Sequence, residues 1–271
     1  MVTRATSFRL PASSASRGHG WRWALLGALV GALITLTLYA PARWLASLLR
    51  EQSAGRLLLV NARGTVWNGM SGVVFASGAG GADAISLPGS LTWKLRPSWG
   101  GLRAALDLSC CTQQPLGLVA SPGVQGLQLR VQDGQSRWPA PLLAGFGAPF
   151  NTLKPEGVLD LSTQGLVLRI ERQQLTFQGR ATLDATDISS SLSTLKPMGS
   201  YRAVLEGGNA PSLLLTTKDG ALRLSGSGRF NGNRLRFSGE ASAAPGREDA
   251  LSNLLNIIGR RDGARSIINL G

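Results

Sequence analysis

Hydrophobic and polar residues alternate along most of the chain after Asn61. A period of two places apolar side chains on one face of a strand and polar ones on the other, which is typical of a half-buried sheet. No long helical period separates the alternating segments, so we expect antiparallel pairing through hairpins. The predicted fold is mainly β, a long curved antiparallel sheet whose strands fall within 90–97, 101–109, 126–134, 157–185, 201–207, 212–230 and 233–243.

The period changes near the end of the chain. Four apolar residues follow one another at i, i+3, i+4 and i+7, which predicts a short amphipathic helix over about 247–258. We expect this helix to cover an end or an edge of the sheet, since a bare edge strand invites aggregation. The residues expected to dock it are Leu251, Leu254, Leu255 and Ile258.

The residues that follow this helix have two interpretations. Gly259 is expected to end the helix in the manner of a C′ glycine. Arg260 and Arg261 then lie beside the negative end of the helix dipole, where basic side chains are stabilising as solvated charges. The alternative is that the two arginines contact a partner, and the sequence leaves both interpretations open.

An uncharged run precedes the alternating region. The twenty residues 23–42 contain no charged side chain, and Arg22 and Arg43 flank them. Twenty residues at about 1.5 Å each span the roughly 30 Å hydrocarbon layer of a bilayer. We therefore predict a disordered tail at 1–20, an uncleaved transmembrane anchor at 21–42, a helical linker at 43–60 and a β-domain at 61–271. Cleavage after Ala42, which would release a soluble periplasmic ligand-binding module, is the alternative.

Basic residues orient the predicted anchor. Four arginines and no acidic residue precede it, whereas Arg43 and Arg50 are opposed by Glu51 after it. The positive-inside rule then places the N-terminus in the cytoplasm and the β-domain outside it, in the periplasm of a bacterial cell.

The formal charge of +13 invites a nucleic-acid interpretation, which the distribution of charge excludes. The first fifty residues hold six arginines and no acidic residue, which leaves +7 on the rest. Those charges are scattered singly along alternating segments and form no clustered basic face of the kind that phosphate backbones require.

Catalytic patterns are missing from the sequence. His19 is the only histidine and lies in the predicted tail, which excludes a Ser-His-Asp triad or a histidine-ligated zinc site in the exported part. The glycine-rich stretch at 226–232 is followed by a predicted strand, not the helix of a dinucleotide site. The carboxylates of strands alternate with apolar residues, as on a solvated face. We therefore expect neither catalytic residue, cofactor nor metal, and no enzymatic activity.

Cys110 and Cys111 are adjacent. In a continuous strand their side chains would point to opposite faces, so a bond between them requires a turn. An oxidising compartment permits such a vicinal disulfide. Two reduced or separately buried small side chains are the other interpretation, and both stay open.

Five segments together resemble a known family. They are GTVWNG at 64–69, LPGSLTWKL at 87–95, GSYR at 199–202, GALRLSGSGR at 220–229, and the strand-to-helix stretch 235–263. Their order after a single anchor resembles the general secretion pathway protein N family of the bacterial type II secretion system. The resemblance implies a non-enzymatic inner-membrane component whose β-domain contacts the platform, the pseudopilus or the secretin.

The expected architecture is also similar to that of long-groove lipid-handling proteins anchored in the same membrane, which is the alternative function. A lipid conduit needs a continuous apolar groove open to solvent, whereas a scaffold buries its apolar face. Alternation along the strands does not distinguish the two.

Overall fold

The computed structural model describes residues 20–271 apart from 77, 79–83, 124–125, 148–149, 172–173 and 233. Two compact units divide the chain, residues 1–40 and 41–271. The tail predicted at 1–20 and its His19 lie, except for Gly20, outside the described residues.

The first unit contains one apolar helix, α1 (Gly20–Leu38). Residues Trp21–Leu38 are long and apolar enough to cross a membrane, by length and composition. The hydroxyls of Thr35 and Thr37 donate to the carbonyl oxygens of Gly31 and Leu33, one turn earlier. Both polar side chains are therefore satisfied within the helix, as a lipid environment requires.

The second unit is one antiparallel sheet. Its helical segments are α2 (Ala42–Gln52), the 3-10 helix η1 (Ala140–Phe146), α3 (Phe150–Leu153) and α4 (Glu248–Ile258). Its strands are β1 (Leu57–Gly64), β2 (Asn68–Ala76), β3 (Ala84–Ser86), β4 (Leu91–Ser98), β5 (Gly101–Leu108), β6 (Leu116–Pro122), β7 (Gly126–Val131), β8 (Gly134–Pro139), β9 (Glu156–Glu171), β10 (Gln174–Ser189), β11 (Gly199–Glu206), β12 (Ser212–Gly220), β13 (Leu222–Asn231), β14 (Arg234–Ala243), β15 (Arg260–Asp262) and β16 (Arg265–Leu270).

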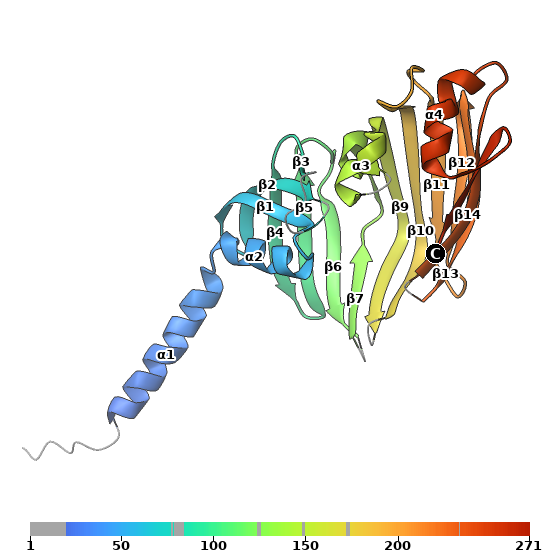
Figure 1. The fold of residues 1–271 in the computed structure, drawn as a ribbon. Helices are drawn as coiled ribbons and strands as arrows, with labels where there is room; N and C mark the ends of the chain where they lie inside the picture. Colours follow the sequence, from blue (N-terminus) through green and yellow to red (C-terminus); the bar gives the residue numbers. More distant parts are fainter. Residues whose placement is uncertain are drawn as a thin grey trace, which may run out of the picture. The chain divides into compact units, whose positions relative to one another are not determined.

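The sheet is a meander that follows the chain. Its order is β1-β2-β4-β5-β6-β7-β9-β10-β11-β12-β13-β14-β16-β15, with β3 paired to β2 and β8 to β9. Figure 1 shows these strands forming one curved sheet, with α3 and α4 near the same end. The predicted long antiparallel sheet is confirmed.

The boundary between the predicted linker and the β-domain lies earlier than expected. α2 ends at Gln52 and β1 begins at Leu57, so residues 57–60 are strand instead of helix. The reason is pairing and burial: Leu57 and Leu59 lie opposite Phe75 and Val73 of β2 and pack against a buried cluster.

Cross-strand register assigns the two faces of the sheet. Leu91 and Trp93 of β4 lie opposite Leu108 and Leu106 of β5, and this apolar pairing recurs from strand to strand. We call this side the apolar face. Charged residues occupy the alternate positions on the other side, which we call the polar face, as a two-residue period requires.

Glycines let aromatic rings lie flat on the apolar face. A Cβ on Gly69 would stand 2.3 Å from the ring of Trp93, whose indole nitrogen donates to the carbonyl of Val66 at 2.9 Å. A Cβ on Gly226 would stand 2.4 Å from the ring of Phe237. The glycine-rich stretch at 226–232 therefore lies in or beside β13 and gives close packing room to a neighbouring strand.

Two buried clusters cover one end of the apolar face. The first, which we call the helix core, combines η1, the strands β9, β10, β11, β13 and β14, the loop before β11, and α4. Its buried members are Ala140, Leu159, Ile188, Met198, Tyr201, Leu222, Ala241, Leu251, Leu254 and Leu255. The second, the cysteine core, contains Val73, Leu87, Leu108, Cys111 and Leu142. Trp138 packs against both clusters. We call this the covered end of the sheet.

α4 lies on the apolar face and not along the sheet edge. Leu251, Leu254 and Leu255 are at most 1% exposed, and the helix contacts β14, β16 and β15. Ile258, at the last turn, is half-buried against the same core. The sheet edge is instead the short strand β15, paired to β16 in a hairpin that the sequence analysis did not predict.

The end of α4 differs from the expected glycine cap. Gly259 has an extended backbone, with φ of −171°, and leads directly into β15. A Cβ at this position would lie 2.5 Å from the carbonyl oxygen of Ile267, so close approach explains the glycine. The buried hydroxyl of Ser266 donates to the carbonyl of Leu255 in the last turn of the helix, which ties β16 to α4.

Replacing Leu255 by alanine should lower the thermal stability of the full chain in detergent. Truncating a fully buried leucine costs roughly 2–5 kcal/mol. For a domain of this size that corresponds to a decrease in melting temperature of roughly 5–15 °C. Ile257→Ala on the same helix is the matched control, since Ile257 is 40% exposed and should lose little. Equal melting temperatures for wild type and Leu255→Ala would mean that α4 does not dock.

Candidate functional site

The structure joins Cys110 and Cys111 by a disulfide in the turn after β5. Cys111 is 4% exposed and belongs to the cysteine core. Its carbonyl accepts a hydrogen bond from the backbone N–H of Arg137 at 2.8 Å, and Thr112 forms a bridge with Ser136. The turn therefore gives β8 a neighbour on the side opposite β9.

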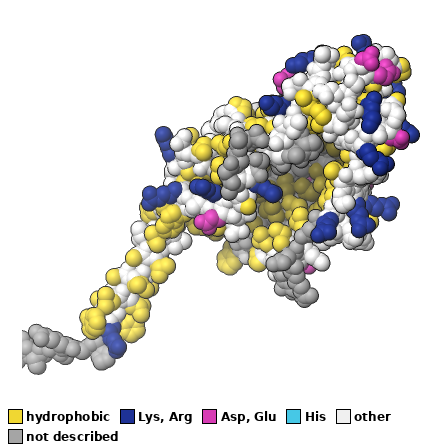
Figure 2. All heavy atoms as spheres, in the orientation of Figure 1, with side chains coloured by type: hydrophobic (Ala, Val, Ile, Leu, Met, Phe, Trp, Pro, Cys, Tyr) yellow, Lys and Arg dark blue, Asp and Glu magenta, His cyan; other side chains and the backbone are white. Residues whose placement is uncertain are grey.

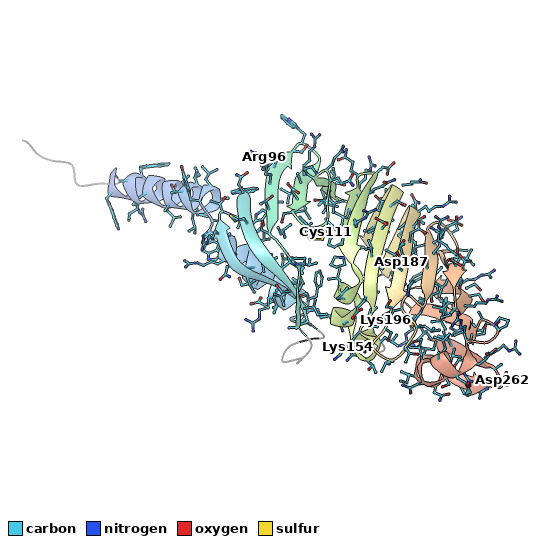
Figure 3. All side chains as sticks on the ribbon, turned by 90° about the horizontal axis from the view of Figure 1, so that it is seen from above. Arg96, Cys111, Lys154, Asp187, Lys196 and Asp262 are labelled. Carbon is cyan, nitrogen blue, oxygen red and sulfur yellow. A yellow bond between two sulfur atoms is a disulfide. The ribbon has the colours of Figure 1, made fainter. Side chains whose placement is uncertain are left out.

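Arg260 and Arg261 lie in β15, the last strand of the sheet. Both are exposed, and they pair through the backbone with Ile267 and Ser266. Among the described residues neither arginine takes part in an ion pair. In Figure 3, Asp262 of the same strand lies far from Cys111, so the arginines and the disulfide are separate sites. The arginines therefore flank an open strand edge whose outer backbone groups face no strand.

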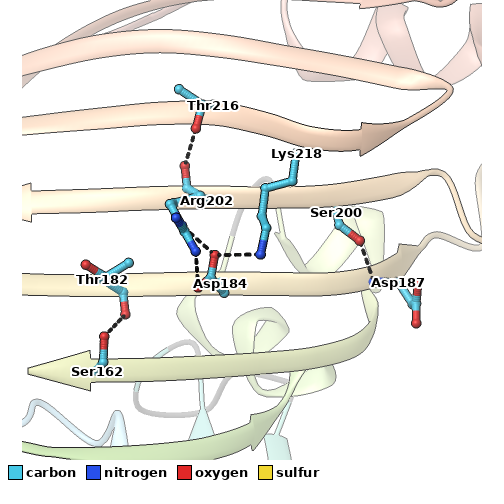
Figure 4. A network of polar contacts seen from close by, with 8 residues as sticks. All are labelled: Ser162, Thr182, Asp184, Asp187, Ser200, Arg202, Thr216 and Lys218. Carbon is cyan, nitrogen blue, oxygen red and sulfur yellow. Dashed lines mark hydrogen bonds and ion pairs between the residues drawn. The ribbon is translucent and has the colours of Figure 1, made fainter.

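A polar network on the polar face centres on Asp184 of β10 (Figure 4). The guanidinium of Arg202 in β11 donates to its two carboxylate oxygens at 2.7 and 2.9 Å, and the ammonium of Lys218 in β12 lies 3.4 Å away. The Asp184 side chain is 23% exposed. Hydrogen bonds from Arg202 hold the pKa of this carboxyl below its usual value, despite an opposing effect of burial.

The other ion pairs of the polar face are also cross-strand clamps. Arg137 pairs with Asp160 at 2.7 Å, and Arg180 pairs with Glu206. In both pairs the carboxylate faces an arginine of a neighbouring strand. In the described ranges, no group of three or more His, Cys, Asp or Glu side chains is placed to hold a metal ion.

The end of the apolar face away from the helices is not covered by either core, and we call it the open end. One row of cross-strand neighbours there runs through six strands without a charged or hydrogen-bonding side chain: Pro97, Leu102, Ala120, Leu129, Leu168 and Phe177. A second row, one step nearer the strand ends, is Pro122, Leu127, Ile170 and Leu175.

Exposure distinguishes the two ends of this face. Leu127, Ile170 and Leu175 are 46%, 46% and 43% exposed, whereas Leu159 at the covered end of β9 is 3% exposed. Figure 2 shows the resulting hollow, lined by hydrophobic side chains over β6, β7 and β9. Sequence analysis predicted the apolar face but missed this site, because alternation does not reveal which part of a face the helices cover.

The described part of the chain is thus one open antiparallel sheet, with a polar face, a half-covered apolar face and an N-terminal helix long enough to span a membrane. The chain belongs to the family described as type II secretion system (T2SS), protein N, whose pattern matches residues 55–268. The match spans all sixteen strands except the last residues of β16. No curated protein and no solved structure matches the chain.

Replacing Asp184 by asparagine should destabilise the sheet in a pH-dependent way. The pKa of Asp184 is lowered on folding, so its stabilising effect is present above the ordinary value of 3.8 and is lost as the pH falls through the folded value. We expect a loss of about 1 kcal/mol at neutral pH, or about 2–4 °C in melting temperature.

The difference from wild type should shrink as the pH falls below about 4. Asp160→Asn is the matched control, because the Arg137 and Asp160 side chains are 66% and 40% exposed and solvent screens them more strongly. Equal losses in the two variants, or a loss independent of pH, would contradict the account of Asp184.

Proposed function

We propose that this protein is a non-enzymatic, single-pass accessory component of the inner membrane in type II secretion. Its sheet domain lies in the periplasm and contacts other secretion components during the export of folded proteins. The observation that carries the proposal is the family match, which covers nearly the whole sheet domain. The apolar helix α1 supports a membrane anchor by its length and composition.

The orientation rests on the charged flanks of the anchor. Arginines without acidic residues precede α1, which favours a cytoplasmic N-terminus and a periplasmic sheet. The disulfide between Cys110 and Cys111 supports the same compartment, because disulfides persist in the periplasm and are rare in the cytoplasm.

A structural role in place of catalysis is supported by the use of the polar side chains. Asp160, Asp184, Glu206 and Glu240 form ion pairs that join neighbouring strands on the polar face. The single histidine of the sequence precedes the anchor. We therefore propose that the domain contacts the platform, the pseudopilus or the secretin. This role requires no cofactor.

The edge strand β15 is the proposed contact. An unpaired strand edge can accept a strand from a partner, and Arg260 and Arg261 add two exposed positive charges to it. Charge complementarity would then favour an acidic partner segment.

Protease added to spheroplasts should digest the sheet domain and leave a membrane-held N-terminal fragment. Protease outside the inner membrane reaches a periplasmic domain, whereas a retained anchor stays protected within the membrane. A cytoplasmic marker protein that stays intact is the control for leakage. A mature protein that begins at Pro41 or Arg43 would show that the anchor is removed, and full protection of the chain would reverse the orientation.

Mild cross-linking in the native membrane, followed by purification of the chain, should capture proteins of the secretion platform or the secretin. Reversing Arg260 and Arg261 to glutamate should reduce both that capture and the secretion of exported proteins, while abundance and melting temperature stay normal. The matched control reverses Arg223 and Arg229, exposed arginines of β13, which changes the charge equally. Unchanged capture and secretion after the first reversal would leave the two arginines as solvated charges only.

A further inference from the structure

The exposed apolar residues of the open end form one continuous surface and are not scattered singly. Leu127, Ile170 and Leu175 are direct cross-strand neighbours, and each is more than 40% exposed. The row beside them crosses six strands, and none of its six members belongs to either core. Contiguous exposed apolar surface of this kind marks a binding site more often than a solvated one.

The chemistry of this surface restricts its ligand. No side chain of either row carries a charge or a hydrogen-bond donor, and the backbone groups of the six strands are paired along the sheet. An extended polypeptide lying on the face would leave its own N–H and C=O groups without partners. A hydrocarbon chain has no such groups to satisfy.

The dimensions suit a single acyl chain. Six neighbouring strands are separated by five spacings of about 4.8 Å, so the longer row extends over about 24 Å along the sheet. One leaflet of a bilayer is roughly 15 Å deep in hydrocarbon, which is the reach of one acyl chain. The row is therefore long enough to accommodate an acyl chain along its whole length.

An aromatic pair ends the row on one side. The rings of Phe177 in β10 and Phe230 in β13 meet edge to face, with centroids 5.4 Å apart and an interplanar angle of 87°. Phe177 is 6% exposed although it belongs to neither core. The pair thus limits the open end on the side of β13, while the row continues in the opposite direction to Pro97 in β4.

The other end of the row has an aromatic side chain of the kind expected beside a lipid headgroup. Trp99, in the turn between β4 and β5, is fully exposed. Arg96 and Arg103, cross-strand neighbours at the adjacent positions, project from the polar face and lie behind the row. Tryptophan favours the membrane interface, so Trp99 suits a headgroup at this end.

We propose that the open end of the apolar face binds an acyl chain of a membrane phospholipid, with its headgroup toward the β4–β5 turn. The source is the bilayer that holds α1, since only residues 39–41 separate that helix from α2 of the sheet domain. The 231 residues 41–271 carry 24 basic and 15 acidic side chains, a formal charge of +9 that favours anionic lipid. This inference goes beyond secretion and does not depend on which partner the edge strand contacts.

The test uses the full chain in vesicles of phosphatidylethanolamine and phosphatidylglycerol, with a trace of phospholipid that carries a photoactivatable group in its acyl chain. After irradiation, mass spectrometry should find the label on peptides of β7, β9 and β10 as well as on α1. Ile170→Glu should lower the labelling of these strands roughly tenfold, because a charge is strongly disfavoured beside hydrocarbon. Leu214→Glu is the matched control: Leu214 is 50% exposed but lies on the polar face, and its replacement should leave labelling unchanged.

Both variants should keep the melting temperature of the wild type, since both positions are exposed. Label on α1 with none on β7, β9 and β10 would overturn the proposal and leave a helix of another protein as the candidate occupant. Equal loss of label in Ile170→Glu and Leu214→Glu, or no loss in either, would overturn it as well. Absence of label from α1 would count against the membrane anchor, so failure of the anchor and failure of the lipid site are distinguishable.

Discussion

Burial of one face of a single open sheet is the constraint on which the rest of the structure depends. A sheet of sixteen strands with one apolar side must cover that side, and here no second sheet is present in the described part of the chain. In this protein the cover is assembled from short pieces: η1 and α3 from the middle of the chain and α4 from its end. Two serines of the loop between β10 and β11 hold these helices in place: Ser190 donates to the carbonyl of Leu153 in α3 and Ser193 to that of Ala250 in α4.

The cover reaches only part of the face, and this incompleteness links the fold to its proposed roles. At the covered end, burial raises the pKa of Tyr201, whose hydroxyl donates to the carbonyl of Leu222 at 3.1 Å. At the open end the strands continue with the same alternation but without a second layer. The edge strand β15 and the open end are therefore separate surfaces, and a secretion partner on one leaves the other free for lipid.

Much of the fold could be predicted from local pattern, since every predicted strand segment lies in or across an observed strand and α4 begins within a residue of the expected position. The hairpin of β15 and β16 could not. Arg260, Arg261 and Asp262 do not alternate with apolar residues, and only pairing with Ile267 and its neighbours makes them a strand. Neither the disulfide nor the open end could be predicted from the sequence, because each depends on which distant segment covers a given position.

The central claim is that one face of the same strands is covered at one end and open at the other. Single cysteines placed at Leu159 and Leu168 of β9 test it directly, because both positions lie on the apolar face and the native cysteines are paired. Their rates of reaction with a maleimide, measured on the folded chain in detergent without reductant, should differ by orders of magnitude. Fast reaction at 168 and none at 159 before unfolding is the predicted result. Equal protection of the two positions would show that the apolar face is covered throughout and would contradict the account.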